Sequence, residues 1–348
     1  MSVSKLAAIT DFILDESNSA ACLHDALDQF SQICSDASGI VPDASFDSWA
    51  DDTFLDGGMA INPQAAAYCI KDYQRSVMFI RGVYAAIKVA QERFVDTPIK
   101  ILYAGCGPFA TLLLPLIGQF KSGELDIHLL DIHQESLDSI KRLINYFGFN
   151  NHTINLLQGD ACSYQHPNAL HLIIAETMQK SLEQEPQFAV TANLAPQLDP
   201  VGIFIPEKIE VALCLAHWES EKELFKRLNN IDEEALIKAG KRHPIGTIFT
   251  LLPEQAAMQM SEASYNKDTS MLELSPQIMQ VPSVDEIESY DALMFTRIQI
   301  FEQYYLKDYE ADLTLPHKCY DLSPLKDGAA YRVCYQLGNY PRFDLSEL

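Results

Sequence analysis

The chain of 348 residues is 48% hydrophobic, enough for two packed domains or one domain with a large extension. Its 48 acidic residues outnumber 25 basic ones, and the formal net charge of -23 repels the phosphates of nucleic acids. No run approaches the roughly 20 apolar residues of a membrane span, and the first residues do not read as a targeting signal. We therefore expect a cytoplasmic protein that binds neither nucleic acid nor membrane.

The eight cysteines are scattered without a CxxC or similar spacing, so we expect neither a metal site nor a disulfide framework. The excess of acid allows two interpretations. It is either a solvated surface that keeps the protein in solution or a preference for a cationic substrate. Charge alone does not decide between them.

The first 95 residues are expected to be helical. Residues 63–94 carry apolar side chains at spacings of three and four, which is typical of one long amphipathic helix or two. The pattern changes at Asp96, where apolar runs begin to alternate with helical stretches. Strands are expected within 99–108, 126–132, 154–161 and 168–178, and helices at 111–120 and 134–148. This alternation predicts a doubly wound, Rossmann-like α/β core with a parallel sheet covered on both faces.

The pattern changes again in the last third of the chain. A charged helical stretch is expected at 219–241, and antiparallel strands at 246–252, 292–301, 310–315 and 329–337. No repeat or flexible linker separates the two halves, so we expect them to pack tightly. The resulting division is a helical region at 1–95, an α/β domain at 96–206 and a strand-rich, β-barrel-like domain at 207–348, with a boundary near Pro206.

A glycine turn follows the first expected strand. Gly105 and Gly107 can adopt positive φ, and a ligand can approach their bare backbone. Asp131 closes the second strand, 24 positions after Gly107, where a carboxylate can accept hydrogen bonds from two ribose hydroxyls. NAD-binding folds share these features, but Ala110 stands where the third glycine of GxGxxG would be. A tight turn with an incidental aspartate is the alternative.

Asp160 follows the third expected strand, between Gly159 and Ala161. At the same edge of the sheet, its carboxylate could accept a hydrogen bond from an adenine amino group. An aspartate at the end of a strand is as often a turn residue or a helix N-cap. Asp160 gains weight as a ligand-binding residue only from its place in the ordered set.

The order of these features resembles class I S-adenosylmethionine-dependent methyltransferases. Residues 71–76 (KDYQRS) are further similar to the KDxxR(S/T) element of the protein arginine methyltransferases. The resemblance implies that Arg75 pairs with the carboxylate of the methionine moiety, as an arginine fork grips a carboxylate. It also implies S-adenosylmethionine as the cofactor, held by Arg75 together with Gly105, Gly107, Asp131 and Asp160.

Two glutamates extend this resemblance. Glu176 and Glu185 are nine positions apart, like the pair in that family's loop that grips a guanidinium. Residues 193–211 are similar to the strand that leads into the family's C-terminal β-barrel, so the resemblance covers about residues 60–215. It implies catalytic roles for both glutamates, and a helical dimerisation arm within 219–241, although a plain solvated helix pair fits that segment nearly as well.

The chemistry of a guanidinium supports the glutamates independently. Its pKa lies above about 12 and its five N–H donors form a planar fork, so two carboxylates can hold it from two directions. They can also aim a nitrogen lone pair at the methyl group, because catalysis here is mainly alignment and charge placement. Glu183 lies on the same stretch and could serve in place of Glu185.

The sequence departs from the family at three places. Pro108 and Phe109 follow Gly107 where the family continues with glycine, and Gln179 replaces another glycine. His317 is the nearest candidate for a histidine that the family contributes from its barrel, although a surface histidine is the commoner interpretation of such a residue. The cofactor and fold are therefore better supported than an arginine substrate.

The expected function is methylation of a guanidino nitrogen, in a cationic small molecule such as free arginine or in an arginine-containing peptide. The alternatives are a small-molecule N- or O-methyltransferase with another acceptor, a non-catalytic cofactor-binding scaffold, and an NAD-dependent dehydrogenase. We expect that the protein can form a homodimer. We also expect the first 55 residues to form a helical cap over the substrate entrance.

Overall fold

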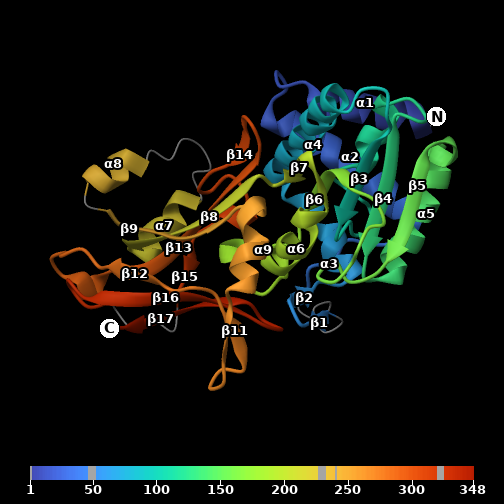
Figure 1. Ribbon diagram of the computed structural model, residues 1–348. Coiled ribbons are helices and arrows are strands. Elements are labelled where there is room, and N and C mark those ends of the chain that lie inside the picture. Colours follow the sequence, from blue (N-terminus) through green and yellow to red (C-terminus); the bar gives the residue numbers. More distant parts are fainter. Residues whose placement is uncertain (1, 46–51, 226–232, 240, 320–324) are drawn as a thin grey trace.

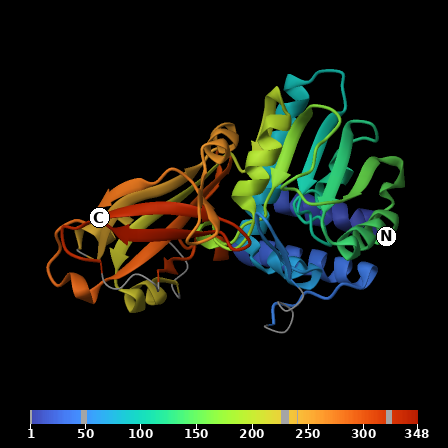
Figure 2. The ribbon, with the colours of Figure 1, turned by 60° about the horizontal axis from the view of Figure 1, so that its bottom comes forward.

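The computed structural model describes residues 2–45, 52–225, 233–239, 241–319 and 325–348. The chain forms two halves that lie side by side, one built on a parallel sheet and the other on antiparallel strands (Figures 1 and 2). One continuous hydrophobic core runs through both halves, which confirms that they pack tightly. No helix within the described ranges is both long and apolar enough to cross a lipid bilayer.

The parallel sheet has the strand order β5-β4-β3-β6-β7. Its strands are β3 (Ile99–Ala104), β4 (Leu125–Asp131), β5 (Thr153–Gln158), β6 (Leu170–Ala175) and β7 (Leu198–Ile205). Strand β6, which lies between β3 and β7, is buried along its whole length, because helices cover both faces of the sheet. The Rossmann-like α/β core predicted from the sequence is confirmed.

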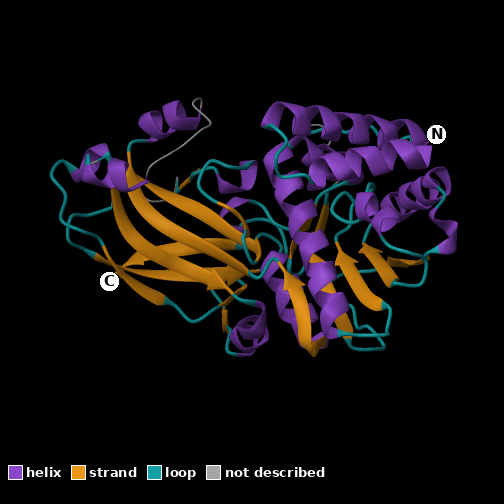
Figure 3. Ribbon diagram, turned by 90° about the horizontal axis from the view of Figure 1, so that it is seen from above, coloured by secondary structure: helices purple, strands orange, loops and turns teal. Residues whose placement is uncertain are grey.

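The helices divide unequally between the two faces. α5 (Gln134–Phe147) and α4 (Tyr73–Arg93) cover one face, and α6 (Gln187–Leu194) covers the other, followed by the 3₁₀ helix η6 (Ala195–Gln197). The larger helical layer lies on one side of the sheet in Figure 3. The expected helices at 63–94 are present as α3 (Pro63–Tyr68), the 3₁₀ turn η2 (Cys69–Lys71) and α4.

The helix expected at 111–120 is wrong. Only the 3₁₀ helix η3 (Leu114–Gln119) forms there, because Pro115 lacks the N–H of a regular helical ladder and Gly118 is a poor helix former. The N-terminal helix α1 (Ser2–Leu14) packs on η3 instead, and Thr10 Oγ1 donates to the carbonyl of Pro115 at 2.8 Å.

Residues 2–38 contribute to the core of the α/β half. α1 packs on α2 (Ala20–Ser38), and α2 packs on α4 and α5. Their apolar faces are completely buried at Ile13, Leu27 and Phe30. These helices therefore lie on the face of the sheet, and the expected cap over the substrate entrance is wrong for them.

The second half contains two antiparallel sheets. The first has the order β14-β13-β8-β9, with β15 beside β13, and the second has the order β10-β11-β16-β12, with β17 beside β16. Their strands are β8 (Lys208–Ala216), β9 (Arg242–Leu251), β10 (Ser264–Asn266), β11 (Met271–Glu273), β12 (Gln277–Gln280), β13 (Asp291–Phe301), β14 (Tyr304–Leu306), β15 (His317–Lys318), β16 (Ala330–Leu337) and β17 (Arg342–Glu347). This arrangement confirms the expected β-barrel-like domain.

Short helices connect these strands. They are α7 (Trp218–Phe225), α8 (Glu233–Lys238), α9 (Pro253–Ser261), η7 (Ile287–Ser289) and η8 (Asp312–Thr314), while η4 (Phe149–Asn151) and η5 (Lys180–Leu182) belong to the first half. The strand expected at 310–315 is wrong, since η8 occupies this segment. The helical stretch expected at 219–241 is present as α7 and α8, and residues 226–232 and 240 lie outside the described residues.

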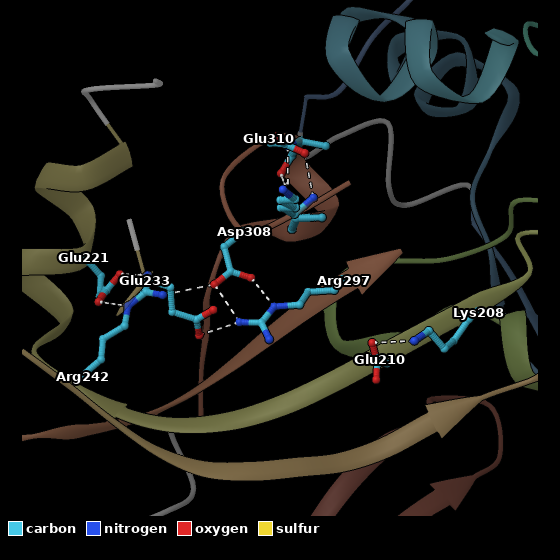
Figure 4. A network of polar contacts seen from close by, with 11 residues as sticks. Lys208, Glu210, Glu221, Glu233, Arg242, Arg297, Asp308 and Glu310 are labelled. Atoms are coloured by element: carbon cyan, nitrogen blue, oxygen red, sulfur yellow. Dashed lines mark hydrogen bonds and ion pairs between the residues drawn. The ribbon is translucent and has the colours of Figure 1, made fainter. Parts of the chain in front are cut away.

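A network of ion pairs fixes α7 and α8 to the barrel (Figure 4). Arg242 is 1% exposed and forms a bidentate pair with Glu221 of α7 at 2.8 and 2.9 Å, while its Nη1 lies 3.1 Å from Asp308. Asp308 also binds Arg297 of β13, which reaches Glu233 of α8 at 2.7 Å. Because breaking a buried ion pair leaves an uncompensated charge, the Arg242–Glu221 pair holds α7 against the strands, whereas the more exposed Arg297–Glu233 pair links α8 to β13 more weakly.

If α2 is part of the core, Phe30→Ala should destabilise the whole α/β half. We expect the free energy of unfolding to fall by about 3–5 kcal/mol, because the substitution leaves a cavity among apolar side chains. Urea denaturation followed by circular dichroism measures this loss. Val41→Ala is the matched control, since Val41 is 67% exposed and its truncation should change stability by less than about 0.5 kcal/mol. A loss below 1 kcal/mol in Phe30→Ala would show that α2 is detachable.

Candidate functional site

The strand order reverses between β3 and β6, because β4 and β5 extend the sheet on one side and β7 on the other. Ligands of doubly wound folds bind at such a switch point, outside the carboxyl ends of the strands. A cavity of about 390 Å³ lies there, within the size range of small-ligand sites. Among the residues that line it are all seven site residues predicted from the sequence, Arg75, Gly105, Gly107, Asp131, Asp160, Glu176 and Glu185.

The glycine turn and Asp131 form one unit. Gly105 and Gly107 have φ of 64° and 61°, a region that favours glycine. A Cβ on Gly105 would lie 2.4 Å from Cγ2 of Thr177, so the glycine turn packs closely on Thr177, just after β6. The backbone N–H of Gly107 donates to Asp131 Oδ2 at 2.8 Å, and that of His133 donates to Oδ1 at 2.9 Å. These bonds fix the carboxylate at the cavity wall.

Asp160 stabilises a turn and also lies in the cavity lining. Its Oδ1 accepts a hydrogen bond from the backbone N–H of Cys162 at 2.8 Å, which is a turn-stabilising bond. The residue also lines the cavity, beside Gly159, whose N–H donates to the carbonyl of Asp131 at 3.0 Å. The ends of β4 and β5 therefore bring both aspartates to the same edge.

Arg75 and Glu176 form a buried ion pair in the cavity wall. Arg75 lies in the first turn of α4, and its Nη2 donates to Glu176 Oε2 at the end of β6. Glu176 is 9% exposed, and its second oxygen, Oε1, is buried without a hydrogen-bond partner among the described residues. Burial raises the pKa of Glu176, and the charge of Arg75 offsets part of that rise. A buried acceptor without a donor is a strong candidate for contact with a ligand.

Glu185 reaches the same cavity from the other end of the loop. Burial of the carboxyl group, with the charge of Glu176 nearby, raises its pKa to about 8, although Arg75 acts in the opposite direction. The carboxyl group therefore changes its protonation near neutral pH, which suits a group that accepts a proton during a reaction.

The acidic loop, which we define as residues 176–186, has an unusual backbone. Ser181, Leu182 and Gln184 are not glycines but have φ of 60°, 55° and 69°. Such conformations each cost about 1–3 kcal/mol and persist where surrounding contacts hold them. Those contacts come from the barrel: the N–H of Ser181 donates to Thr296 Oγ1 at 2.7 Å, and the N–H of Gln184 donates to the carbonyl of Pro341 at 2.8 Å.

The cavity wall carries an excess of negative charge. Its described lining includes seven carboxylates, with Arg75 and His133 as the basic residues. Asp72 is one of these acids, and its pKa is raised to about 6, mainly because the residue is buried and partly because Asp312 is close, whereas Arg75 acts against the rise. A cationic ligand would relieve this repulsion.

Glu183 and His317 lie elsewhere. His317 Nε2 is 3.4 Å from Glu183, and neither residue lines the cavity. Burial lowers the pKa of His317, which is half-buried on β15. The contribution expected from Glu183 in place of Glu185, and that of His317 as a site histidine, have no support in this geometry.

Sequence reasoning missed three acids of the site. Asp52, Asp72 and Asp312 line the cavity, but they come from segments far apart in the chain. Asp72 had a recognisable local signal, because it caps α4 through the N–H of Arg75. The N–H of Asp312 then donates to Asp72 at 2.8 Å, a contact between the two halves with no local signature.

No protein-family model matches the sequence, and no curated protein matches it. Among solved structures, the chain is similar to the Trypanosoma brucei PRMT1 enzyme-prozyme heterotetrameric complex with AdoHcy. The two are 13% identical, with a TM-score of 0.46, and the match covers 80% of this chain and 91% of that chain. Likeness at this level identifies no function, so the inferences below are drawn from this chain's own residues.

The raised pKa of Glu185 predicts a pH dependence of stability. Between pH 4.5, the ordinary pKa of a glutamate, and about pH 8, the folded state binds the proton of Glu185 more tightly than the unfolded state does. The resulting stabilisation is complete below about pH 4.5 and is lost as the pH rises through about 8. Glu185→Gln should therefore reduce the fall in unfolding free energy between pH 5 and pH 8. Urea denaturation across this range measures the slope, with Glu183→Gln as control, and an unchanged slope in Glu185→Gln would refute the assignment.

Proposed function

We propose that the protein is an S-adenosylmethionine-dependent methyltransferase that acts on a guanidino nitrogen. The observation that carries this proposal is a single cavity lined by two kinds of groups. Asp131, Asp160 and the glycine turn lie at the carboxyl edge of β3 to β5, while Glu176 and Glu185 flank the loop after β6. The first group suits a nucleoside, and the second suits a cation.

The residues at the nucleoside end fit the cofactor. The carboxylate of Asp131 is held by two backbone N–H groups and retains lone pairs for the ribose hydroxyls. The backbone of Gly107, which lines the cavity, is uncrowded, because even a Cβ there would meet only Ala66, at 3.5 Å. Arg75 would grip the carboxylate of the methionine moiety while keeping its bond to Glu176. When bound, the cofactor supplies an electrophilic methyl group on a sulfonium sulfur.

The two glutamates would hold the acceptor. Oε2 of Glu176 already binds Arg75, whereas Oε1 has no hydrogen-bond partner among the described residues. Oε1 could therefore accept a hydrogen bond from one edge of a guanidinium. Glu185 would accept from another N–H and aim the remaining nitrogen at the methyl group. The nitrogen held in this way would take up the methyl group that the cofactor supplies and would lose a proton, which Glu185 would accept, since its pKa is about 8.

The acceptor class is the finer part of this proposal. The acidic cavity favours a cation, and a free guanidino compound and an arginine-containing peptide both meet that requirement. The cytoplasmic location and the homodimer formed through α7 and α8 remain predictions. The small-molecule N- or O-methyltransferase and the cofactor-binding scaffold remain the alternatives that the experiments below separate.

Glu176→Gln should abolish the transfer while sparing the cofactor. We expect kcat to fall by about a hundredfold or more, because a neutral amide cannot balance the positive charges of Arg75 and the bound guanidinium. Binding of S-adenosylhomocysteine, measured by isothermal titration, should weaken by less than tenfold. Methyl transfer is assayed with arginine, other guanidino compounds and arginine-rich peptides.

Glu183→Gln is the matched control, because it makes the same chemical change in the same loop outside the cavity. Its kcat should stay within twofold of the wild-type value. Cofactor binding by the wild type without transfer to any guanidine would move the search to other acceptors or to a scaffold role. Failure of the wild type to bind S-adenosylhomocysteine would overturn the proposal.

Asp131→Asn tests the nucleoside end. The amide presents one acceptor oxygen where the carboxylate has two, so the backbone N–H groups and the ribose compete for it. We expect the Kd for S-adenosylhomocysteine to rise by about tenfold or more. Asp126→Asn, on the same strand, is the control, because Asp126 faces Asn155 and His128 away from the cavity. Equal affinities of the two variants would contradict the assigned role of Asp131.

A further inference from the structure

A small hairpin that the sequence did not predict forms part of the cavity wall. Strands β1 (Thr53–Leu55) and β2 (Gly58–Ala60) pair antiparallel, with Gly57 in the turn between them. Several of its residues line the cavity, including Leu55, Met59 and Ala60. The hairpin is too short to be stable alone, so its position depends on what it contacts.

The first residue of β2, Gly58, lies very close to the backbone of Glu185 and Pro186. A Cβ on Gly58 would lie 2.6 Å from the backbone nitrogen of Pro186 and 2.7 Å from the carbonyl carbon of Glu185. Gly58 also has φ of 145°, which a residue with a side chain rarely adopts. The next residue adds a hydrogen bond, because the N–H of Met59 donates to the carbonyl of Gln184 at 2.7 Å.

The open end of the hairpin contacts the nucleoside end of the cavity. Thr53 Oγ1 lies 3.2 Å from His133 Nε2, and the N–H of His133 donates to Asp131. Just before the hairpin, Asp52 accepts from the backbone and side-chain N–H groups of Asn62 at 2.8 and 2.9 Å. The hairpin therefore spans the cavity from the residues around Asp131 to the loop around Glu185.

We propose that this hairpin fixes the backbone of Glu185 for the acceptor and that Gly58 is a positioning residue. The inference rests on the proposed function and adds a residue that touches neither cofactor nor acceptor. Its physical basis is close approach: backbone atoms 2.6–2.8 Å from a Gly58 Cβ cannot yield as a flexible side chain would. Three residues of the acidic loop just before Glu185 have strained φ values, so tertiary contacts such as those of Gly58, and not regular secondary structure, set the position of Glu185.

The first experiment compares Gly58→Ala with Gly246→Ala. Gly246 has a nearly identical φ, of 143°, but a Cβ there meets only Cε of Met279, at 2.9 Å, so this control reproduces the backbone strain with a contact to the end of a flexible side chain. In Gly58→Ala we expect kcat for a guanidino acceptor to fall at least tenfold, while the Kd for S-adenosylhomocysteine stays within twofold. Gly246→Ala should match the wild type in both. Equal losses in the two variants, or unchanged kcat in Gly58→Ala, would overturn the proposal.

The second experiment needs neither catalysis nor a variant that folds. Hydrogen exchange of the wild type, followed by mass spectrometry, should show residues 53–60 and 179–186 opening together, because Met59 is bonded to Gln184. Independent exchange of the two segments would refute the coupling. A wild type that methylates no guanidine would overturn the proposed function alone, and the exchange data would still decide whether the hairpin holds the loop.

Discussion

The burial of Glu176 at the carboxyl end of β6 constrains the whole site. A carboxylate that is 9% exposed needs a partner, and Arg75 provides it from the first turn of α4. This pair requires α4 to begin at the carboxyl edge of the sheet, and Asp72 caps the helix at that point. Helix α4 is thus tied to the end of β6.

The site concentrates like charges where the polypeptide holds them in place. Arg75 is the one arginine against seven acids in the described lining. Burial raises the pKa of Asp72 to about 6 and that of Glu185 to about 8, and the nearby charges of Asp312 and Glu176, respectively, add to these rises. The overall net charge of -23 is dispersed, whereas the cavity focuses a local field that favours a cation.

Both halves of the molecule build the acidic loop. Its three residues with positive φ are held by Thr296 of β13, by Pro341 beside β17, and by the hydroxyl of Tyr335, which donates to the carbonyl of Leu182. The hairpin of residues 53–60 also contacts the loop, through the N–H of Met59, which donates to the carbonyl of Gln184. The barrel therefore has a direct part in shaping the site, since the α/β half alone would leave a strained loop without these contacts.

Local patterns in the sequence determined the sheet, the helices at 63–94 and 134–148, and the residues at the ends of β3 to β6. These features follow from periodic burial and from the chemistry of glycine and acids, which neighbours in the chain already display. Only the tertiary structure packed α1 on η3, and only it brought Asp52 and Asp312 to the cavity. Those outcomes depend on contacts between distant segments, and a single sequence carries no local signal of which surfaces will meet.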